Sequence, residues 1–130
     1  LSIMNYLLDT HTLIWFLKGE NELSKKIVKT IENSDATVYV SIASIWELSI
    51  KISLGKFSFP NGIEGFIKLV EENGFEILPI TLADTIKISS LEYIHRDPFD
   101  RIMIAQSLGN DLIIITKDSH IKKYTVKTLW

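Results

Sequence analysis

Four residues that are spread along the chain have carboxylate side chains of the kind that binds hard metal ions: Asp9, Glu47, Asp100 and Asp118. Carboxylates crowded in one place repel one another and raise each other's pKa unless a cation neutralises them. An all-carboxylate oxygen site prefers the hard ions Mg²⁺ and Mn²⁺ to zinc. Such ions can activate water and hold the oxygens of a phosphodiester during in-line displacement. The four acids together therefore predict metal-dependent chemistry on a phosphodiester.

Taken singly, each acid also has a structural interpretation. Asp9 follows an apolar run and can cap the helix that comes next. Glu47 can be a solvated surface acid, and Asp118 can cap a turn. Asp100 can lie in the first turn of a helix, where an acid interacts favourably with the helix dipole. None of these four signals is specific alone.

Asp97 and Asp100 are three residues apart, in the stretch HRDPFDRIMIAQSLGND. Asp97 precedes Pro98, and proline is favoured at the first position of a helix. This order predicts Asp97 as the N-cap. Whether Asp100 only stabilises the helix or also holds a metal depends on the rest of the chain.

Five short segments predict the strands that must position these acids. The run Leu112–Ile115 suits a strand buried on both faces of a parallel sheet. The last segment alternates apolar and polar residues, as a half-exposed edge strand does. The predicted strands are Asn5–Asp9, Thr37–Ser41, Phe75–Ile80, Asp111–Thr116 and Tyr124–Trp130.

Helical patterns lie between these strands. The first three are Thr10–Leu17, a segment capped by Ser24, and a segment from Ile42 that stops at Gly55. The next two are Ile63–Asn73 and Thr81–Ile94, the second with a capping-box pair of Thr81 and Asp84. The last begins at Asp97 and ends at Gly109. Alternating strands and helices predict an α/β fold with a mainly parallel sheet.

The topology of a parallel sheet sends the four acids to one edge. Asp9 ends the first strand and Asp118 lies two residues beyond the fourth. Glu47 lies about one turn into the helix after the second strand, and helical side chains lean toward the N-terminus. Asp100 lies in the first turn of its helix. All four are thus expected at the carboxyl edge, where open α/β sheets bind ligands.

Length and composition set broad limits. The 130 residues suit one compact domain over 4–130, with residues 1–3 expected to be a non-native leader before Met4. A net charge of −2 does not indicate a strongly basic nucleic-acid binder. The chain has no cysteine, which fits a reducing compartment such as the cytoplasm. No apolar run approaches the length of a membrane span.

Four blocks of the sequence resemble those of a known family. The blocks NYLLDTHTLIWFL, SIASIWELSIK, HRDPFDRIMIAQSL and LIIITKD are similar to successive blocks of PIN domains, and more narrowly of the VapC-like toxins of type II toxin–antitoxin systems. The resemblance runs from Asn5 to Asp118. It implies a three-layer α/β/α sandwich and a Mg²⁺- or Mn²⁺-dependent endoribonuclease that cleaves RNA.

The resemblance also assigns roles to individual residues. The family's acidic positions match Asp9, Glu47, Asp100 and Asp118, as catalytic and metal-binding residues, so Asp97 remains the cap. Thr116 falls at a small hydroxyl position that orients the site. The family further implies a homodimer and inhibition by a cognate antitoxin, whose C-terminal segment would lie across the active-site groove.

Several other side chains have two interpretations each. Arg96, Arg101 and Lys117 can bind RNA phosphates or belong to a solvated face, and Arg101 can instead pair with an acid. His11 and His95 lie beside proposed ligands and can serve the chemistry or simply hydrogen-bond a carboxylate. Three aromatic residues can line the groove or pack in the core; these are Trp15, Phe16 and Trp46.

The sequence lacks the acidic residues that two other classes of α/β phosphotransfer protein need. A receiver domain needs a phosphorylated Asp after the third strand, where the sequence reads LPITL. A haloacid-dehalogenase-type phosphatase needs Asp-x-Asp after the first strand, where it reads Asp9, Thr10, His11. The remaining alternative is a PIN-like module that binds RNA or protein with weak or no nuclease activity.

Overall fold

The computed structural model describes residues 4–130, so the expected leader at residues 1–3 lies outside the described residues. Five strands form a parallel sheet in the order β3-β2-β1-β4-β5. The strands are β1 (Asn5–Leu8), β2 (Thr37–Ser41), β3 (Glu76–Leu78), β4 (Ile113–Ile115) and β5 (Thr128–Leu129). The predicted parallel α/β architecture is confirmed.

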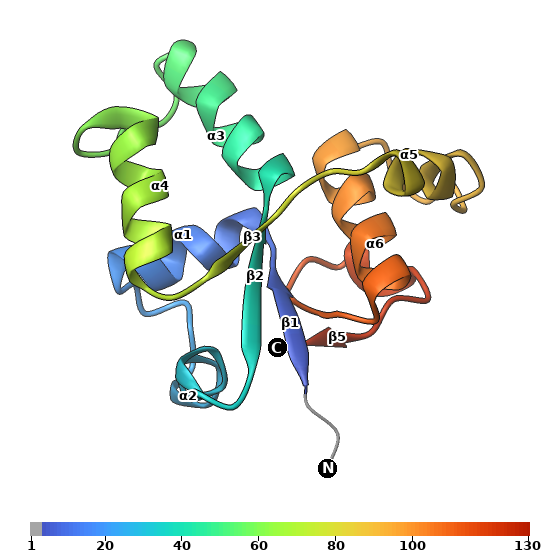
Figure 1. Ribbon diagram of the computed structural model, residues 1–130, viewed down its shortest axis with the longest axis horizontal. Helices are drawn as coiled ribbons and strands as arrows, with labels where there is room; N and C mark the ends of the chain where they lie inside the picture. Colours follow the sequence, from blue (N-terminus) through green and yellow to red (C-terminus); the bar gives the residue numbers. More distant parts are fainter. Residues whose placement is uncertain (1–3) are drawn as a thin grey trace.

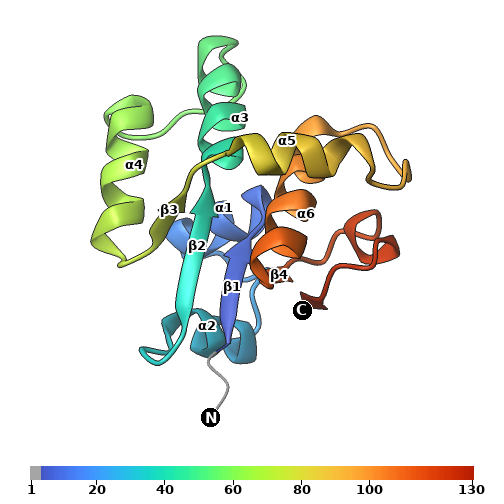
Figure 2. The ribbon, with the colours of Figure 1, turned by 45° about the vertical axis from the view of Figure 1, so that its right-hand side comes forward.

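Helices cover both faces of this sheet. They are α1 (Thr10–Lys18), α2 (Lys25–Glu32), α3 (Ile42–Ser53), α4 (Gly62–Glu72), α5 (Leu82–Ser89) and α6 (Pro98–Asn110). Helices α1, α2 and α4 lie on one side of the strands and α5 and α6 on the other, while α3 extends beyond the carboxyl ends of the strands (Figures 1 and 2). Across residues 4–130, no helix is long and apolar enough to cross a bilayer.

The central strand β1 is buried on both faces because a helical layer packs against each. Leu8 belongs to the apolar cluster that includes Leu13 of α1 and Phe66 of α4. The adjacent Leu7 points to the opposite face and packs in the cluster of Ile102 and Met103 from α6. This two-sided burial holds the carboxyl end of β1 at a defined place.

Several predicted elements are shorter than expected. The strands predicted over Phe75–Ile80 and Asp111–Thr116 form only over Glu76–Leu78 and Ile113–Ile115. The helix predicted over Thr81–Ile94 ends at Ser89, although its capping box is present. The carbonyls of Leu91 and Glu92 instead accept hydrogen bonds from the Arg101 guanidinium, at 3.5 and 3.0 Å. This contact from α6 holds the non-helical segment that follows α5.

The predicted strand Tyr124–Trp130 is confirmed as an edge, but pairs only over Thr128–Leu129. Its neighbour β4 is three residues long and offers few partners. Before it, a 3₁₀ turn covers Ile121–Lys123. Helix α6 also continues through Gly109 to Asn110 and ends at Asp111, which has a left-handed backbone with φ of 52°.

Gly65 and Gly109 provide a matched test of helix packing. A Cβ on Gly65 would overlap the Pro60 carbonyl oxygen, whereas one on Gly109 would meet nothing within 4 Å. We expect Gly65→Ala to lower the free energy of unfolding by about 1–3 kcal/mol. Gly109→Ala should raise it by about 0.4–1 kcal/mol, because alanine restricts the unfolded chain. Urea unfolding measures both, and equal effects would contradict this packing of α4.

Candidate active site at the carboxyl edge of the sheet

Asp9 directly follows β1 and is both a helix cap and a member of the candidate site. Its Oδ1 accepts a hydrogen bond from the Thr12 backbone N–H at 2.8 Å, and its Oδ2 accepts one from the Thr116 hydroxyl. The Thr116 oxygen in turn accepts a hydrogen bond from the Asp118 backbone N–H at 3.0 Å. Asp9 is 5% exposed and Thr116 is fully buried. Thr116 thus joins two predicted site acids through one hydroxyl group.

Asp118 lies in the turn that leads from β4 to the 3₁₀ segment. Its Oδ1 accepts hydrogen bonds from the backbone N–H groups of His120 at 2.7 Å and Ile121 at 3.2 Å. The turn-capping interpretation is therefore correct for this residue. It does not remove Asp118 from the site, because Asp9 and Asp118 line the same pocket.

Glu47 comes from α3 and reaches the first residue of α1. Its Oε1 accepts a hydrogen bond from the Thr10 hydroxyl at 2.9 Å, and its Oε2 lies 3.3 Å from Lys51 Nζ. Thr10 also lies 2.9 Å from the Ser44 hydroxyl. The sequence interpretation did not include Thr10; its place beside Asp9 was the available signal. This hydroxyl ties Glu47 to the chain segment that carries Asp9.

Asp97 is the N-cap of α6, as predicted. Its Oδ1 accepts hydrogen bonds from the backbone N–H groups of Phe99 and Asp100, at 2.9 and 3.0 Å. Asp100 lies one turn inward, and its Oδ2 lies 3.1 Å from His95 Nε2. Burial raises the pKa of the Asp100 carboxyl to about 6; the His95 hydrogen bond opposes the shift, and the negative charges of Asp97 and Asp118 add to it.

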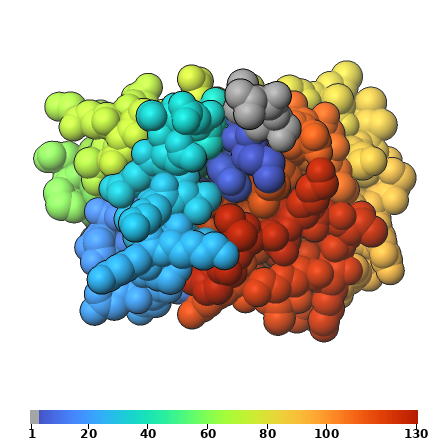
Figure 3. Space-filling view, turned by 90° about the horizontal axis from the view of Figure 1, so that it is seen from below, coloured from blue at the N-terminus to red at the C-terminus, as the bar shows by residue number. Residues whose placement is uncertain are grey.

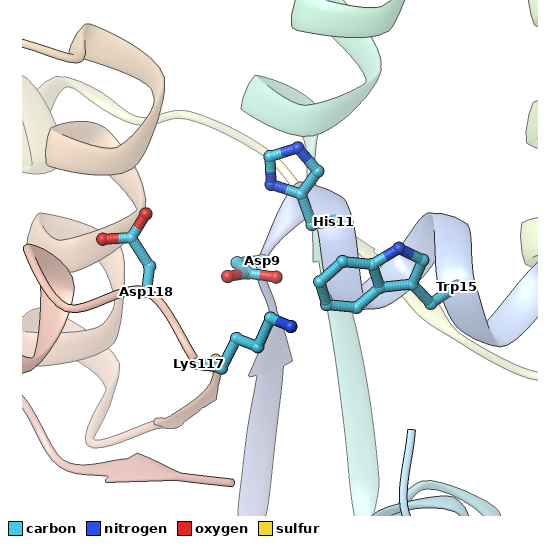
Figure 4. A pocket seen from close by; sticks show the side chains of 5 residues that line it. All are labelled: Asp9, His11, Trp15, Lys117 and Asp118. Atoms are coloured by element: carbon cyan, nitrogen blue, oxygen red, sulfur yellow. The ribbon is translucent and has the colours of Figure 1, made fainter. Parts of the chain in front are cut away.

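The pocket beside Asp9 has a volume of about 280 Å³ and also receives His11, Trp15 and Lys117. Figure 4 shows Asp9 near the centre, Asp118 on one side, and His11 and Trp15 of α1 on the other. The His11 and Trp15 rings stack at a centroid distance of 5.7 Å. The Lys117 ammonium lies 4.8 Å from the Trp15 ring centroid. The pocket thus combines carboxylates, a cation and an aromatic wall.

The two aromatic residues Phe16 and Trp46 do not line this pocket. Phe16 packs against Phe75 at a centroid distance of 5.5 Å and belongs to the core. Trp46 is exposed on α3 and meets Phe99 edge-on at 5.0 Å. Only Trp15 of the three lines the pocket with Asp9.

The three basic residues predicted to bind RNA differ in their surroundings. Lys117 and Arg96 are exposed. Arg101 is 8% exposed, and its guanidinium donates to the Tyr124 hydroxyl at 3.0 Å and to main-chain carbonyls, over the Tyr93 ring. The expected RNA contact of Arg101 is therefore corrected to a structural role, because its donors are used inside the protein.

The four acids lie at one edge of the sheet, but their carboxylates are not arranged around a common metal position. Within residues 4–130, no three His, Asp or Glu side chains form a group arranged to hold a metal ion. Each acid is instead held by donors of the protein. The donor chemistry still fits Mg²⁺ or Mn²⁺, since carboxylate oxygens are the ligands such ions prefer. Binding by three of them requires side-chain movement from this arrangement.

Comparison with known proteins places this arrangement in a family. A PIN domain family model matches residues 6–127. The chain therefore belongs to the PIN domain family. No curated protein sequence matches it significantly.

Solved structures share the fold at low identity. A chain of VapBC2 from Rickettsia felis, solved with a DNA fragment from its promoter, is 13% identical, with a TM-score of 0.75 over 97% of this chain and 98% of that one. A chain of VapBC-5 from Mycobacterium tuberculosis, of the VapBC family of toxin–antitoxin systems, is 16% identical, with a TM-score of 0.59 over 96% and 97%. The PIN domain endonuclease Utp24 is 16% identical, with a TM-score of 0.54 over 92% and 74%. At these identities the likeness concerns the fold.

The raised pKa of Asp100 predicts a stability effect in metal-free protein. Folding shifts this pKa from an ordinary 3.8 to about 6, so stability falls as pH rises from 3.8 to 6 and stays lower above it. At pH 7.5, Asp100→Asn should raise the free energy of unfolding by up to about 3 kcal/mol. The difference should shrink toward zero below pH 4.

Urea unfolding in EDTA at pH 4 and pH 7.5 measures this difference. The exposed Asp35→Asn serves as the control and should change little at either pH. An Asp100→Asn effect that is equal at both pH values would contradict the burial of a charged carboxylate at this position.

Proposed function

We propose that this PIN domain is a Mg²⁺- or Mn²⁺-dependent endoribonuclease and the toxin of a type II toxin–antitoxin pair. One observation carries the proposal. Asp9, Glu47, Asp100 and Asp118 come from four separate segments and lie at the same edge of a PIN-type sheet, and two of them line its pocket. Such convergence favours phosphodiester chemistry over a set of unrelated helix caps.

The proposed ligands are the four acids, directly or through water. One or two ions held there would lower the pKa of a water molecule for attack on phosphorus and would stabilise charge on the departing 3′ oxygen, leaving a 5′ phosphate. The pKa of Asp100, raised by burial and by neighbouring carboxylates, supports a cationic occupant, because a nearby positive charge relieves that repulsion.

The chain's own groups have distinct proposed tasks. Asp9 is buried and fixed by two donors, so its carboxylate keeps one orientation at the pocket floor. Lys117, which lines the pocket, and the exposed Arg96 are the proposed contacts to RNA phosphates, which are negatively charged. His11 and Trp15 present aromatic surface beside the acids, on which an unpaired base can stack. These groups together favour single-stranded RNA as the substrate.

Asp9→Asn tests the proposed activity directly. Asparagine keeps the size of the side chain but removes its charge, so cleavage of RNA should fall by at least about 100-fold while the thermal unfolding profile stays cooperative. The control Asp35→Asn lies at the opposite end of β2 and should cleave like wild type. Cleavage sites are mapped in parallel for wild type and Asp100→Ala.

Chelation completes this test. EDTA should abolish cleavage by the wild-type protein, and added Mn²⁺ should restore it. Cleavage that persists in EDTA, or full activity of Asp9→Asn, would refute the metal-dependent mechanism.

A second candidate function is a PIN-like module that binds RNA or protein with weak or no nuclease activity. The absence of a three-membered metal-binding group within residues 4–130 favours it. Tight binding of a partner by a protein that cleaves no RNA at any Mn²⁺ concentration would select this candidate.

Exposed apolar side chains support the proposed protein partners, an antitoxin and a second copy of the chain. Helix α3 and its C-cap Leu54 expose a row with a spacing of four residues: Ile42, Trp46, Ile50 and Leu54. Leu82 and Ile86 are exposed on α5. Exposed apolar rows of this kind mark protein contacts. The cytoplasm, where RNA and such partners meet, is the proposed compartment.

Lys117→Ala tests the proposed RNA contact apart from catalysis. In an Asp9→Asn background, loss of one phosphate contact should reduce the slope of log affinity against log salt by about 0.7 for single-stranded RNA. Fluorescence anisotropy with a labelled oligonucleotide measures this slope. Lys29→Ala is the matched control, because α2 lies at the end of the strands opposite α3 (Figure 1), on the face of the molecule that Figure 3 shows. Equal slopes for both variants would remove Lys117 from the interface.

A further inference from the structure

A chain of side-chain hydrogen bonds runs behind Asp100 and has no place in the mechanism above. Asp100 Oδ2 lies 3.1 Å from His95 Nε2, and His95 Nδ1 lies 2.8 Å from the Tyr124 hydroxyl oxygen. That oxygen also receives the Arg101 guanidinium at 3.0 Å and the His95 backbone N–H at 3.3 Å. The chain thus links Asp100, through the two ring nitrogens of His95, to Tyr124 and Arg101.

Counting protons on the Tyr124 hydroxyl determines the direction of these bonds. A hydroxyl oxygen has two acceptor lone pairs and one proton. The Arg101 guanidinium and the His95 backbone N–H are both obligate donors, so they occupy the two lone pairs. The hydroxyl proton must then be donated to His95 Nδ1. The neutral His95 ring therefore carries its hydrogen on Nε2 and donates it to Asp100.

The far end of the chain is firmly held. Arg101 is buried and also donates to the Glu92 carbonyl at 3.0 Å. Tyr124 is 6% exposed and packs in the apolar cluster of Ile104 and Ile114. These contacts fix the Tyr124 hydroxyl, and through it the tautomer and the plane of the His95 ring.

His95 itself is held between neighbours. The His120 ring stacks on the His95 ring at a centroid distance of 5.3 Å and an angle of 7°. The His95 side chain is 10% exposed. A ring fixed in this way cannot turn its Nε2 away from Asp100 without losing these contacts.

We propose that His95 is the positioning residue for Asp100, held as the Nε2–H tautomer by Tyr124 and Arg101. This inference rests on the proposed function, in which Asp100 is a metal ligand. Asp9 is oriented by a main-chain N–H and the Thr116 hydroxyl, and Asp118 by main-chain N–H groups. Asp100 differs, because its donor is a histidine side chain. Its Oδ1, like Oδ2 of Asp118, accepts no hydrogen bond from residues 4–130.

Partners of this kind are usual around metal sites, where ligating carboxylates are themselves hydrogen-bonded and loss of the partner costs about 10–100-fold in metal affinity or activity. A donor on Oδ2 directs the other oxygen of Asp100 toward an incoming ion. Removing the donor leaves the carboxylate in place but free to rotate.

The first experiment reads the tautomer without any cleavage assay. The chain has three histidines, so the ring signals in a two-bond ¹H–¹⁵N NMR spectrum are few, and His95→Gln assigns the His95 set. We expect the Nε2–H tautomer with a slowly exchanging Nε2 proton in the metal-free protein. Tyr124→Phe should speed that exchange, and the exposed Tyr93→Phe should not. An Nδ1–H pattern, or exchange that Tyr124→Phe does not alter, would overturn the inference.

The second experiment measures the Mn²⁺ concentration that gives half-maximal RNA cleavage. His95→Leu should raise it about 10–100-fold, whereas His95→Gln, whose amide can still donate to Asp100, should stay within a few-fold of wild type. Equal effects of the two substitutions would reduce His95 to a packing role. Wild-type protein that cleaves no RNA would refute the proposed function, and the NMR experiment would still decide the tautomer.

Discussion

The hydrogen bond from the Thr116 hydroxyl to Asp9 is the contact on which the acidic edge depends. Strands β1 and β4 are parallel neighbours in which Leu8 pairs with Ile115, so Asp9 and Thr116 are the next pair along the ladder. The Asp9 backbone N–H continues the ladder to the Ile115 carbonyl at 3.3 Å. Because the same hydroxyl accepts the Asp118 amide, one buried threonine sets the distance between two acids from opposite ends of the chain.

Each acid at this edge has a different way of tolerating its charge. Asp9 and Asp118 accept main-chain N–H groups at the starts of helical turns, where negative charge is favoured. Glu47 is paired with Thr10 and Lys51. Asp100 accepts a hydrogen bond from one histidine, which lowers its pKa, but burial raises the pKa by more than this bond lowers it. The fold thus keeps the acids near one another but separately held, which explains why no three form a preformed metal-binding group within residues 4–130.

Predictions from local sequence signals were correct where the partner lies a few residues away. Asp97 with Pro98 marked the start of α6, and Thr81 with Asp84 marked the start of α5, because a capping interaction spans one helical turn. The end of α5 could not be found in this way, and the segment that follows it is held by Arg101, ten residues beyond Leu91. The interpretation of Arg101 also depended on distant contacts, because a guanidinium is suited to phosphate and to buried carbonyls alike.

The pattern of apolar residues determines the order of strands and helices along the sequence and the parallel sheet. It also determines the edge that receives the four acids, because chain connectivity forces parallel strands to end on one side. The contacts that orient the acids do not follow from it. Glu47 meets Thr10 across 37 residues, and His95 meets Tyr124 across 29. Such contacts depend on how layers pack, and a hydroxyl or an imidazole acquires its partner, its tautomer and its burial only when those layers close around it.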